Sequence, residues 1–410
     1  MKNKRKLAIA RKNILNVNML LSKNPDIILR DKWPSYFRKS KKYNVWDLDG
    51  NKYYDMFFGV GQSNLGYAND LVDKKVIKEI KLGNMCSLNS PYEVDLSTEL
   101  INTHKWSNFV KFAKSGGEAN AIAVRIARSN TKKKNIAICG YHGWHDWYLS
   151  SNLASKKNLN NHLFKNLEPH GIHPNLKNTT FTFKYNDFES LKYLVDKKRI
   201  GIVKMEVQRF EKPKNNFLKK IQDLCLKKKL ILIFDECTTG FRECYGGLHL
   251  KYNIKPDIVT YGKALGNGYP ITAVLCSKKL KQKAEKCFIS STFWTEKSGS
   301  VAALETLKIM KKEKPWVQIT RVGKKIKKFW LEVSKEFNIP IKVTGLDSIP
   351  VFYFKVKNSE KVKKFFVAEM LKKKILATNL IYVSQVHNSI ILKKYFKSFR
   401  EVFKKISKDL

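Results

Sequence analysis

The sequence predicts an α/β fold with a mainly parallel sheet flanked by helices, and a smaller α+β lobe built from both termini. From about residue 110, short apolar strands alternate with amphipathic helices, as in parallel-sheet proteins. Residues 230–234 are apolar throughout, as expected for a strand covered on both faces. From about residue 311, helices are interspersed with isolated strands such as 351–356. We therefore expect an N-terminal segment packing with the small lobe at 1–52, a large domain at 53–310 and a small C-terminal domain at 311–410.

The individual elements follow from local patterns. The first forty residues are basic and helix-like. Residues 45–55 predict two short strands around a turn at Asp49-Gly50, because glycine takes a positive φ without steric cost. The other predicted elements of the large domain are strands at 109–113, 135–139, 202–206, 230–234, 258–261 and 273–276, and helices at 118–129 and 217–228.

The composition is dominated by charge. The chain has 410 residues, is 43% hydrophobic and carries a formal net charge of +45. Lysine far outnumbers arginine, whereas base recognition in nucleic acids favours arginine. We interpret the charge as lysine-rich solvated faces that bind polyanions without specificity, and we expect no specific nucleic-acid partner.

Cysteine usage and hydropathy indicate the compartment. Seven cysteines occur without a CxxC pair, so neither a disulfide framework nor a zinc site is expected. The N-terminus is basic, but the apolar run at 7–10 is too short for a signal peptide. No uninterrupted apolar stretch of about 18 residues exists, so no membrane span is expected. These features predict a cytoplasmic protein.

Asp235 ends the apolar strand at 230–234. Ligands of open α/β sheets bind at the carboxyl ends of the strands. A carboxylate at this edge can pair with a protonated ring nitrogen of a ligand, although an acid in a loop or at a helix cap fits the same residues.

Lys263 follows Asp235 by 28 residues (263 − 235) and comes directly after another strand. Gly262 and Gly266 flank it and allow close approach of a ligand. Partial burial would lower the pKa of this amine and make it nucleophilic toward an aldehyde. One strand–helix–strand unit would fill the separation and return Lys263 to the neighbourhood of Asp235.

Two further turns supply candidate binding groups. Ser115, Gly116 and Gly117 lead from a strand into a helix, where free N–H groups can hold a phosphate, although an ordinary turn has the same composition. Tyr141 and His142 follow another strand, and an aromatic side chain there could stack on a flat ring. A metal site made of His142 and the neighbouring histidine and aspartate at 145–146 is disfavoured, and a structural role is expected for those two residues.

Together these segments resemble the class III aminotransferase family, in particular its glutamate-1-semialdehyde aminomutase-like branch. The resemblance extends over nearly the whole chain. The stretches that carry it are 45–55, 65–67, 115–119, 141–143, 235–242, 256–257, 262–270, 291–293, 377–379 and 386–387.

The resemblance implies a homodimeric fold-type I enzyme that uses pyridoxal 5'-phosphate. Lys263 would hold the cofactor as a Schiff base and transfer the substrate proton, and Asp235 would pair with the pyridine nitrogen. The other implied cofactor contacts are Ser115, Gly116 and Gly117 to the phosphate, Tyr141 on the ring with His142 beside it, Glu206 near the ring phenolate or the substrate, and Thr292, or alternatively Thr295, to the phosphate of the neighbouring subunit.

The chain also departs from the family pattern. Many relatives carry a hydroxyl residue at the position of Gly117, so the phosphate site loses one donor. Glu206 is followed by Val207 rather than proline, and the usual Gly-Asn-Pro is absent from 292–303. The entrance of the active site is therefore expected to differ.

The predicted function is amino-group transfer between an amine or amino acid and an aldehyde or ketone. An intramolecular aminomutase acting on a glutamate-1-semialdehyde-like substrate is the alternative, and a catalytically silent polyanion-binding relative is a remote one. A glutamate donor usually needs an arginine for its α-carboxylate, for which Arg242 is a candidate.

Overall fold

The structure is a computed structural model that describes residues 2–409. The chain forms two compact units. One unit combines the N-terminal part up to Asp73 with the C-terminal part from Lys314, and the other comprises Lys74–Glu313. The unit that contains both chain ends extends beyond the boundary predicted at residue 52, because β3 (Lys52–Asp55) pairs with strands of that unit.

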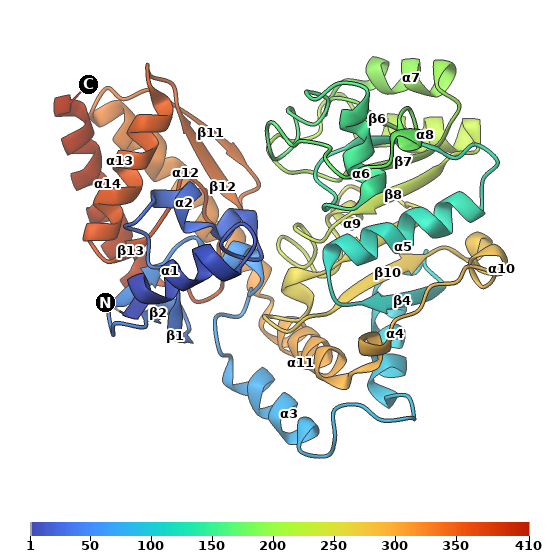
Figure 1. The fold of residues 1–410 in the computed structure, drawn as a ribbon, viewed down its shortest axis with the longest axis horizontal. Helices are drawn as coiled ribbons and strands as arrows, with labels where there is room; N and C mark the ends of the chain where they lie inside the picture. Colours follow the sequence, from blue (N-terminus) through green and yellow to red (C-terminus); the bar gives the residue numbers. More distant parts are fainter. Residues whose placement is uncertain (1, 410) are drawn as a thin grey trace. The chain divides into compact units, whose positions relative to one another are not determined.

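A seven-stranded sheet forms the centre of the Lys74–Glu313 unit (Figure 1). Its strand order is β4-β10-β9-β8-β7-β5-β6. β10 is antiparallel to both of its neighbours, and the pairs from β9 to β6 are parallel. The short connection from β9 to β10 excludes a crossover and therefore requires this reversal. The strands are β4 (Phe109–Ala113), β5 (Asn135–Cys139), β6 (Thr180–Thr182), β7 (Ile200–Glu206), β8 (Ile231–Asp235), β9 (Ile258–Tyr261) and β10 (Thr272–Cys276).

Helix α5 (Gly116–Ser129) covers one face of this sheet, where its buried alanines and isoleucines join Ile231 and Ile233 in one core. Side chains alternate along a strand, so Asp235 points to the same face as Ile233. The other helices of the unit are α4 (Pro91–Thr103), α6 (Asp146–Leu149), α7 (Phe188–Lys197), α8 (Phe217–Lys228), α9 (Leu248–Lys251), α10 (Lys281–Ala284) and α11 (Lys297–Glu313), and α3 (Asp70–Ile80) crosses the boundary between the units.

The connection from β8 to β9 differs from the expected strand–helix–strand unit. It contains only the single-turn helix α9. Glu236 holds the connection by accepting hydrogen bonds from the backbone nitrogens of Leu248 and His249, at 2.6 and 3.0 Å. β9 nevertheless lies parallel and next to β8.

The unit of the chain ends contains the predicted hairpin, formed by β2 (Asn44–Asp47) and β3 around Gly50 with φ of +86°. β1 (Phe37–Lys41) and β13 (Ile375–Leu376) complete its four-stranded sheet, so the first forty residues are only partly helical. An aromatic core around Trp330 and Phe352 holds the unit together. Its other elements are α1 (Lys2–Asn13), α2 (Pro25–Leu29), α12 (Pro315–Glu336), β11 (Ile341–Gly345), β12 (Pro350–Phe354), α13 (Ser359–Lys372) and α14 (Ser389–Asp409).

No helix within residues 2–409 is both long enough and apolar enough to cross a membrane.

Candidate active site

Asp235 lies at the centre of a polar cluster at the carboxyl ends of the strands. The sheet register places it beside Glu206 on one side and Thr260 on the other. Its Oδ2 accepts hydrogen bonds from Asn120 Nδ2 at 2.7 Å and His142 Nδ1 at 2.9 Å. Its Oδ1 accepts one from the backbone nitrogen of Cys237 at 3.1 Å. This carboxylate is buried, yet it is surrounded by donors.

The electrostatics keep Asp235 ionised. Burial by itself would raise the pKa of Asp235, but the hydrogen bond from His142 and the charge of Lys204 outweigh burial and hold this pKa below its ordinary value. Burial lowers the pKa of His142, whose Nδ1 faces the carboxylate. A neutral imidazole that donates from Nδ1 is therefore the form that satisfies Asp235.

Lys263 follows β9 in a left-handed backbone conformation with φ of +43°. Residues other than glycine rarely adopt this backbone conformation, and such backbone strain often accompanies functional sites. The amine is partly buried and donates to Thr238 Oγ1 at 2.7 Å. Burial, together with the positive charges of Arg209 and Arg242, lowers the pKa of Lys263 to about 8. A substantial fraction of this amine is therefore neutral near physiological pH.

The turns at Gly116 and Gly262, which are predicted to lie close to a ligand, both lie against the side chain of Cys237. A Cβ atom at Gly116 would lie 3.5 Å from Cys237 Sγ, and one at Gly262 would lie 3.6 Å from it. Ser115 caps α5 in a capping box with Glu118, which satisfies backbone donors at the helix start. The turn after β4, the turn after β9 and the end of β8 thus converge.

Gly117 has no room for a side chain. A Cβ atom there would lie 2.6 Å from Cε1 and 2.9 Å from Nδ1 of His145. The His145 ring stacks on Trp144 with ring centroids 4.5 Å apart, and its buried Nδ1 has no hydrogen-bond partner among residues 2–409. The imidazole therefore occupies the space that a side chain at position 117 would need.

Tyr141 and Glu206 lie next to each other at the same edge. The backbone nitrogen of Tyr141 donates to Glu206 Oε2 at 3.1 Å. Glu206 also forms an ion pair with Arg209, at 2.6 Å. Arg209 in turn donates to the hydroxyl of Thr238, at 3.3 Å, to which Lys263 also donates. An ion pair thus stands beside the candidate nucleophile.

Thr292 is not among the residues that hydrogen-bond to this cluster in the part of the chain that the structure describes. It is exposed, and the hydroxyl of Thr295 donates to its carbonyl at 2.8 Å. Trp294 holds this segment against α5 by donating to Glu118 Oε1 at 3.1 Å.

Several residues of the cluster were not predicted, namely Asn120, Lys204, Arg209 and Thr238. Asn120 could have been found because it is a polar residue on the apolar face of α5. Lys204 could have been found because it is a lysine inside a buried strand. Arg242, the arginine that we considered for a donor carboxylate, is fully buried and donates to the carbonyl of Thr238 at 2.7 Å. Arg209 instead lines a cavity together with Glu206.

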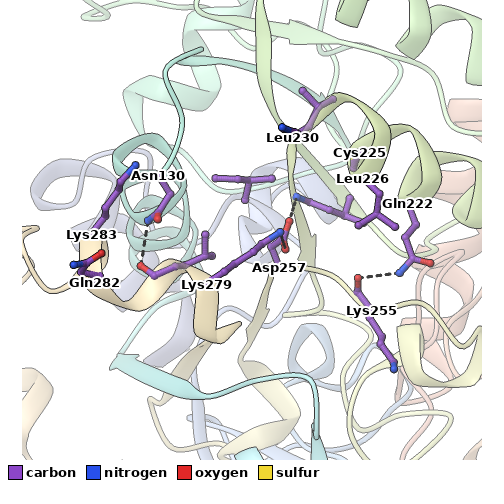
Figure 2. A pocket seen from close by; sticks show the side chains of 14 residues that line it. Asn130, Gln222, Cys225, Leu226, Leu230, Lys255, Asp257, Lys279, Gln282 and Lys283 are labelled. Atoms are coloured by element: carbon purple, nitrogen blue, oxygen red, sulfur yellow. Dashed lines mark hydrogen bonds and ion pairs between the residues drawn. The ribbon is translucent and has the colours of Figure 1, made fainter.

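Two cavities of this unit differ in their relation to the cluster. A cavity of about 380 Å³ is lined by Glu206 and Arg209, together with Gly140, His162 and Lys184. A second cavity, of about 350 Å³, lies where β8 and β9 begin and is lined by Asp257 and several lysines (Figure 2). The second cavity contains none of the predicted site residues.

Comparison with known proteins agrees with this architecture. The family Aminotransferase class-III matches residues 30–392. A 3-aminobutyryl-CoA aminotransferase of Cloacimonas acidaminovorans (strain Evry) is 32% identical over 345 residues, which cover 81% of this chain and 78% of that protein. A glutamate-1-semialdehyde 2,1-aminomutase of Methanosphaera stadtmanae is 30% identical over 336 residues, or 78% of this chain and 77% of that protein.

Among solved structures, the FumI protein of Sphingopyxis sp. MTA144 in its PLP internal aldimine form superposes with a TM-score of 0.88 at 22% identity. The superposition covers 99% of this chain and 97% of that protein, and it shows a shared fold.

The chain belongs to the class III aminotransferase family. The predicted family, the α/β fold and the enzyme class are thereby confirmed, and pyridoxal 5'-phosphate is the cofactor.

Proposed function

We propose that this enzyme moves an amino group from an amine or amino acid to a separate aldehyde or ketone. The donor then leaves as a carbonyl compound, and the acceptor leaves as an amine. The observation that supports amino-group transfer most directly is that β8 ends in an ionised, buried Asp235 while the neighbouring β9 is followed by Lys263, whose pKa is lowered to about 8.

The phosphate end of the cofactor fits the start of α5. The first-turn amides at Gly116 and Gly117 point out of the helix, where the helix dipole favours an anion. The space above Gly117 is lined by the unpartnered Nδ1 of His145. We assign His145 as the donor that replaces the missing hydroxyl. Ser115 would complete the site once its hydroxyl turns away from Glu118 Oε2, to which it donates at 3.0 Å.

The ring end of the cofactor fits Asp235. The single hydroxyl proton of Thr260 has two acceptors, Asn120 Oδ1 at 3.1 Å and Asp235 Oδ1 at 3.3 Å. If Thr260 donates to Asn120, one lone pair of Asp235 Oδ1 is left for the protonated ring nitrogen. Tyr141 would lie on the face of the cofactor ring. His142 would keep Asp235 in place through its hydrogen bond to Oδ2.

When bound, pyridoxal 5'-phosphate withdraws electrons from the bond that must break at the substrate carbon. Lys263 Nζ would anchor the cofactor, then be released by the incoming amine and act as the base that removes the substrate proton and returns it. Thr238 orients this amine through the 2.7 Å hydrogen bond. Asp235 keeps its charge throughout, because its donors remain in place.

The Glu206–Arg209 pair would decide which substrates enter. Arg209 can meet a substrate carboxylate if Glu206 gives up its ion pair, so an acidic donor is compatible with this site. The relative at 32% identity is named an aminotransferase, which supports intermolecular transfer. The aminomutases among the relatives support intramolecular transfer as the second candidate.

We further infer a cytoplasmic homodimer with shared active sites. All seven cysteines are unpaired, in keeping with a reducing compartment. Thr292 is exposed, whereas the hydroxyl of Thr295 is engaged with the backbone, so Thr292 is the better candidate to reach the phosphate bound by the neighbouring subunit.

An absorption spectrum of the purified enzyme tests the function. A visible cofactor band should disappear when the correct amine is added and return when a carbonyl acceptor follows. A single substrate that is converted without any acceptor would instead establish the aminomutase. The absence of any band after addition of the cofactor would contradict both.

A further inference from the structure

Lys204 is a lysine in the middle of an apolar strand. It lies in β7 and its side chain is fully buried, at 0% exposure. No side-chain carboxylate of residues 2–408 forms an ion pair with it. Burying an amine costs free energy unless the amine is well paired, so packing alone does not explain a lysine here.

The Lys204 side chain points to the face of the sheet that holds the active-site cluster. Its Nζ donates to Asn120 Oδ1 at 2.8 Å. The other end of the same amide, Asn120 Nδ2, donates to Asp235 Oδ2 at 2.7 Å and to the carbonyl of His142 at 3.2 Å. Asn120 therefore links the buried amine to the carboxylate that faces the cofactor ring.

The direction of this link follows from donor and acceptor chemistry. A protonated lysine has three donors and no acceptor, so it can only face the carbonyl oxygen of Asn120. The rotated amide would place two donors against each other at Lys204 and would turn its oxygen toward the Asp235 carboxylate. Lys204, through a shorter hydrogen bond than the 3.1 Å one from Thr260 to the same oxygen, thus favours the amide orientation that supports Asp235.

Resting on the function proposed above, we propose that Lys204 is a positioning residue that acts through Asn120 to hold Asp235 ready for the cofactor ring nitrogen. Lys204 itself touches neither cofactor nor substrate. Its charge also contributes to the low pKa of Asp235, while burial lowers its own pKa.

The test measures binding of pyridoxamine 5'-phosphate to the cofactor-free protein by fluorescence titration, together with the thermal midpoint Tm. This probe cannot bond covalently to Lys263, so its Kd reports the ring and phosphate contacts. Lys204→Met should weaken binding about tenfold without lowering Tm, because an apolar side chain of similar length suits the strand. Lys204→Gln retains a donor for Asn120 and should bind nearly as the wild type does.

Lys327→Met is a matched control in the other unit. Lys327 donates to the carbonyl of Gly345 at 2.6 Å and to Asp347 at 2.9 Å. Its replacement should lower Tm and leave the Kd of the probe unchanged.

A double-mutant cycle tests whether the effect passes through Asn120. Combined with Asn120→Leu, the Lys204→Met change should alter the Kd less than about twofold, since the link is already broken. An equal loss in both backgrounds, no loss in Lys204→Met, or a Lys204→Met protein that melts lower or fails to fold would each overturn the proposal. A wild type that does not bind the probe would overturn the proposed function as well.

Discussion

Asp235 and Asp257 lie at opposite ends of strands in the same sheet, and the two carboxylates have different surroundings. Asp235 ends β8, whereas Asp257 precedes β9 at the other edge, where Figure 2 shows Lys279 reaching toward it. Asp257 accepts a hydrogen bond from the backbone of Leu232 at 2.9 Å and pairs with Lys279, whose side chain is 58% exposed. Asp235 instead has buried partners, and Lys204, the lysine linked to it through Asn120, is fully buried.

The comparison shows that burial and hydrogen-bond partners decide whether a lysine or an aspartate becomes reactive here. The number of such residues in the chain matters less. Water screens the charges at the lysine-lined edge, so their interactions are weak. At the other edge, burial strengthens each interaction. Burial lowers the pKa of Lys263, whereas the hydrogen bond from His142 and the charge of Lys204 lower the pKa of Asp235 against the effect of burial. The predictions below compare one edge with the other.

The largest effect is expected for Lys263→Ala. Loss of the anchoring amine and of the base should reduce amino transfer about 10³-fold or more and abolish the visible cofactor band. Lys279→Ala at the opposite edge is the control and should leave both unchanged. Steady-state rates and absorption spectra of the two variants decide the matter, and a Lys263→Ala enzyme that retains both would refute the assignment.

Asp235→Asn should rank second. The amide keeps the shape but removes the charge that stabilises a protonated ring nitrogen, so turnover should fall roughly 10²-fold. Asp257→Asn should lower the thermal midpoint only slightly and should not affect turnover. Equal losses of turnover in the two variants would show that the edge of the sheet is irrelevant.

His145→Ala should weaken binding of pyridoxal 5'-phosphate about tenfold, the loss expected for one hydrogen bond to a charged group. Gly117→Ser should displace the ring, since a Cβ there would lie 2.6 Å from His145. In the double variant the new hydroxyl has room and should recover part of the affinity. Titration of the cofactor-free proteins measures these changes, and unchanged affinity in His145→Ala would remove His145 from the phosphate site.

The smallest effect concerns pH. Only the neutral amine attacks an aldehyde, and burial lowers the pKa of Lys263 to about 8. The rate at which cofactor-free enzyme captures pyridoxal 5'-phosphate should therefore rise with pH and reach half its maximum near pH 8. An exposed lysine would reach that point near its ordinary pKa of about 10.4. A half-maximum near that higher value would mean that Lys263 behaves as a surface amine.

Local pattern was enough to predict much of this protein. The apolar run before Asp235, the strand before Lys263 and the turn at Gly50 each depend on a few consecutive residues, and each element formed where it was predicted. The connection after β8 was harder to predict, because Glu236 orders it through contacts with the backbone twelve and thirteen residues away.

The sequence by itself determined the strand ends that present Asp235 and Lys263, because period and hydropathy are local properties of the chain. Only the tertiary structure decided what surrounds them. Asn120 meets Asp235 across 115 residues and Lys204 across 84, and His145 fills the space that Gly117 leaves open. Such contacts depend on how α5 packs on the sheet, and no local pattern specifies which polar side chains that packing brings together.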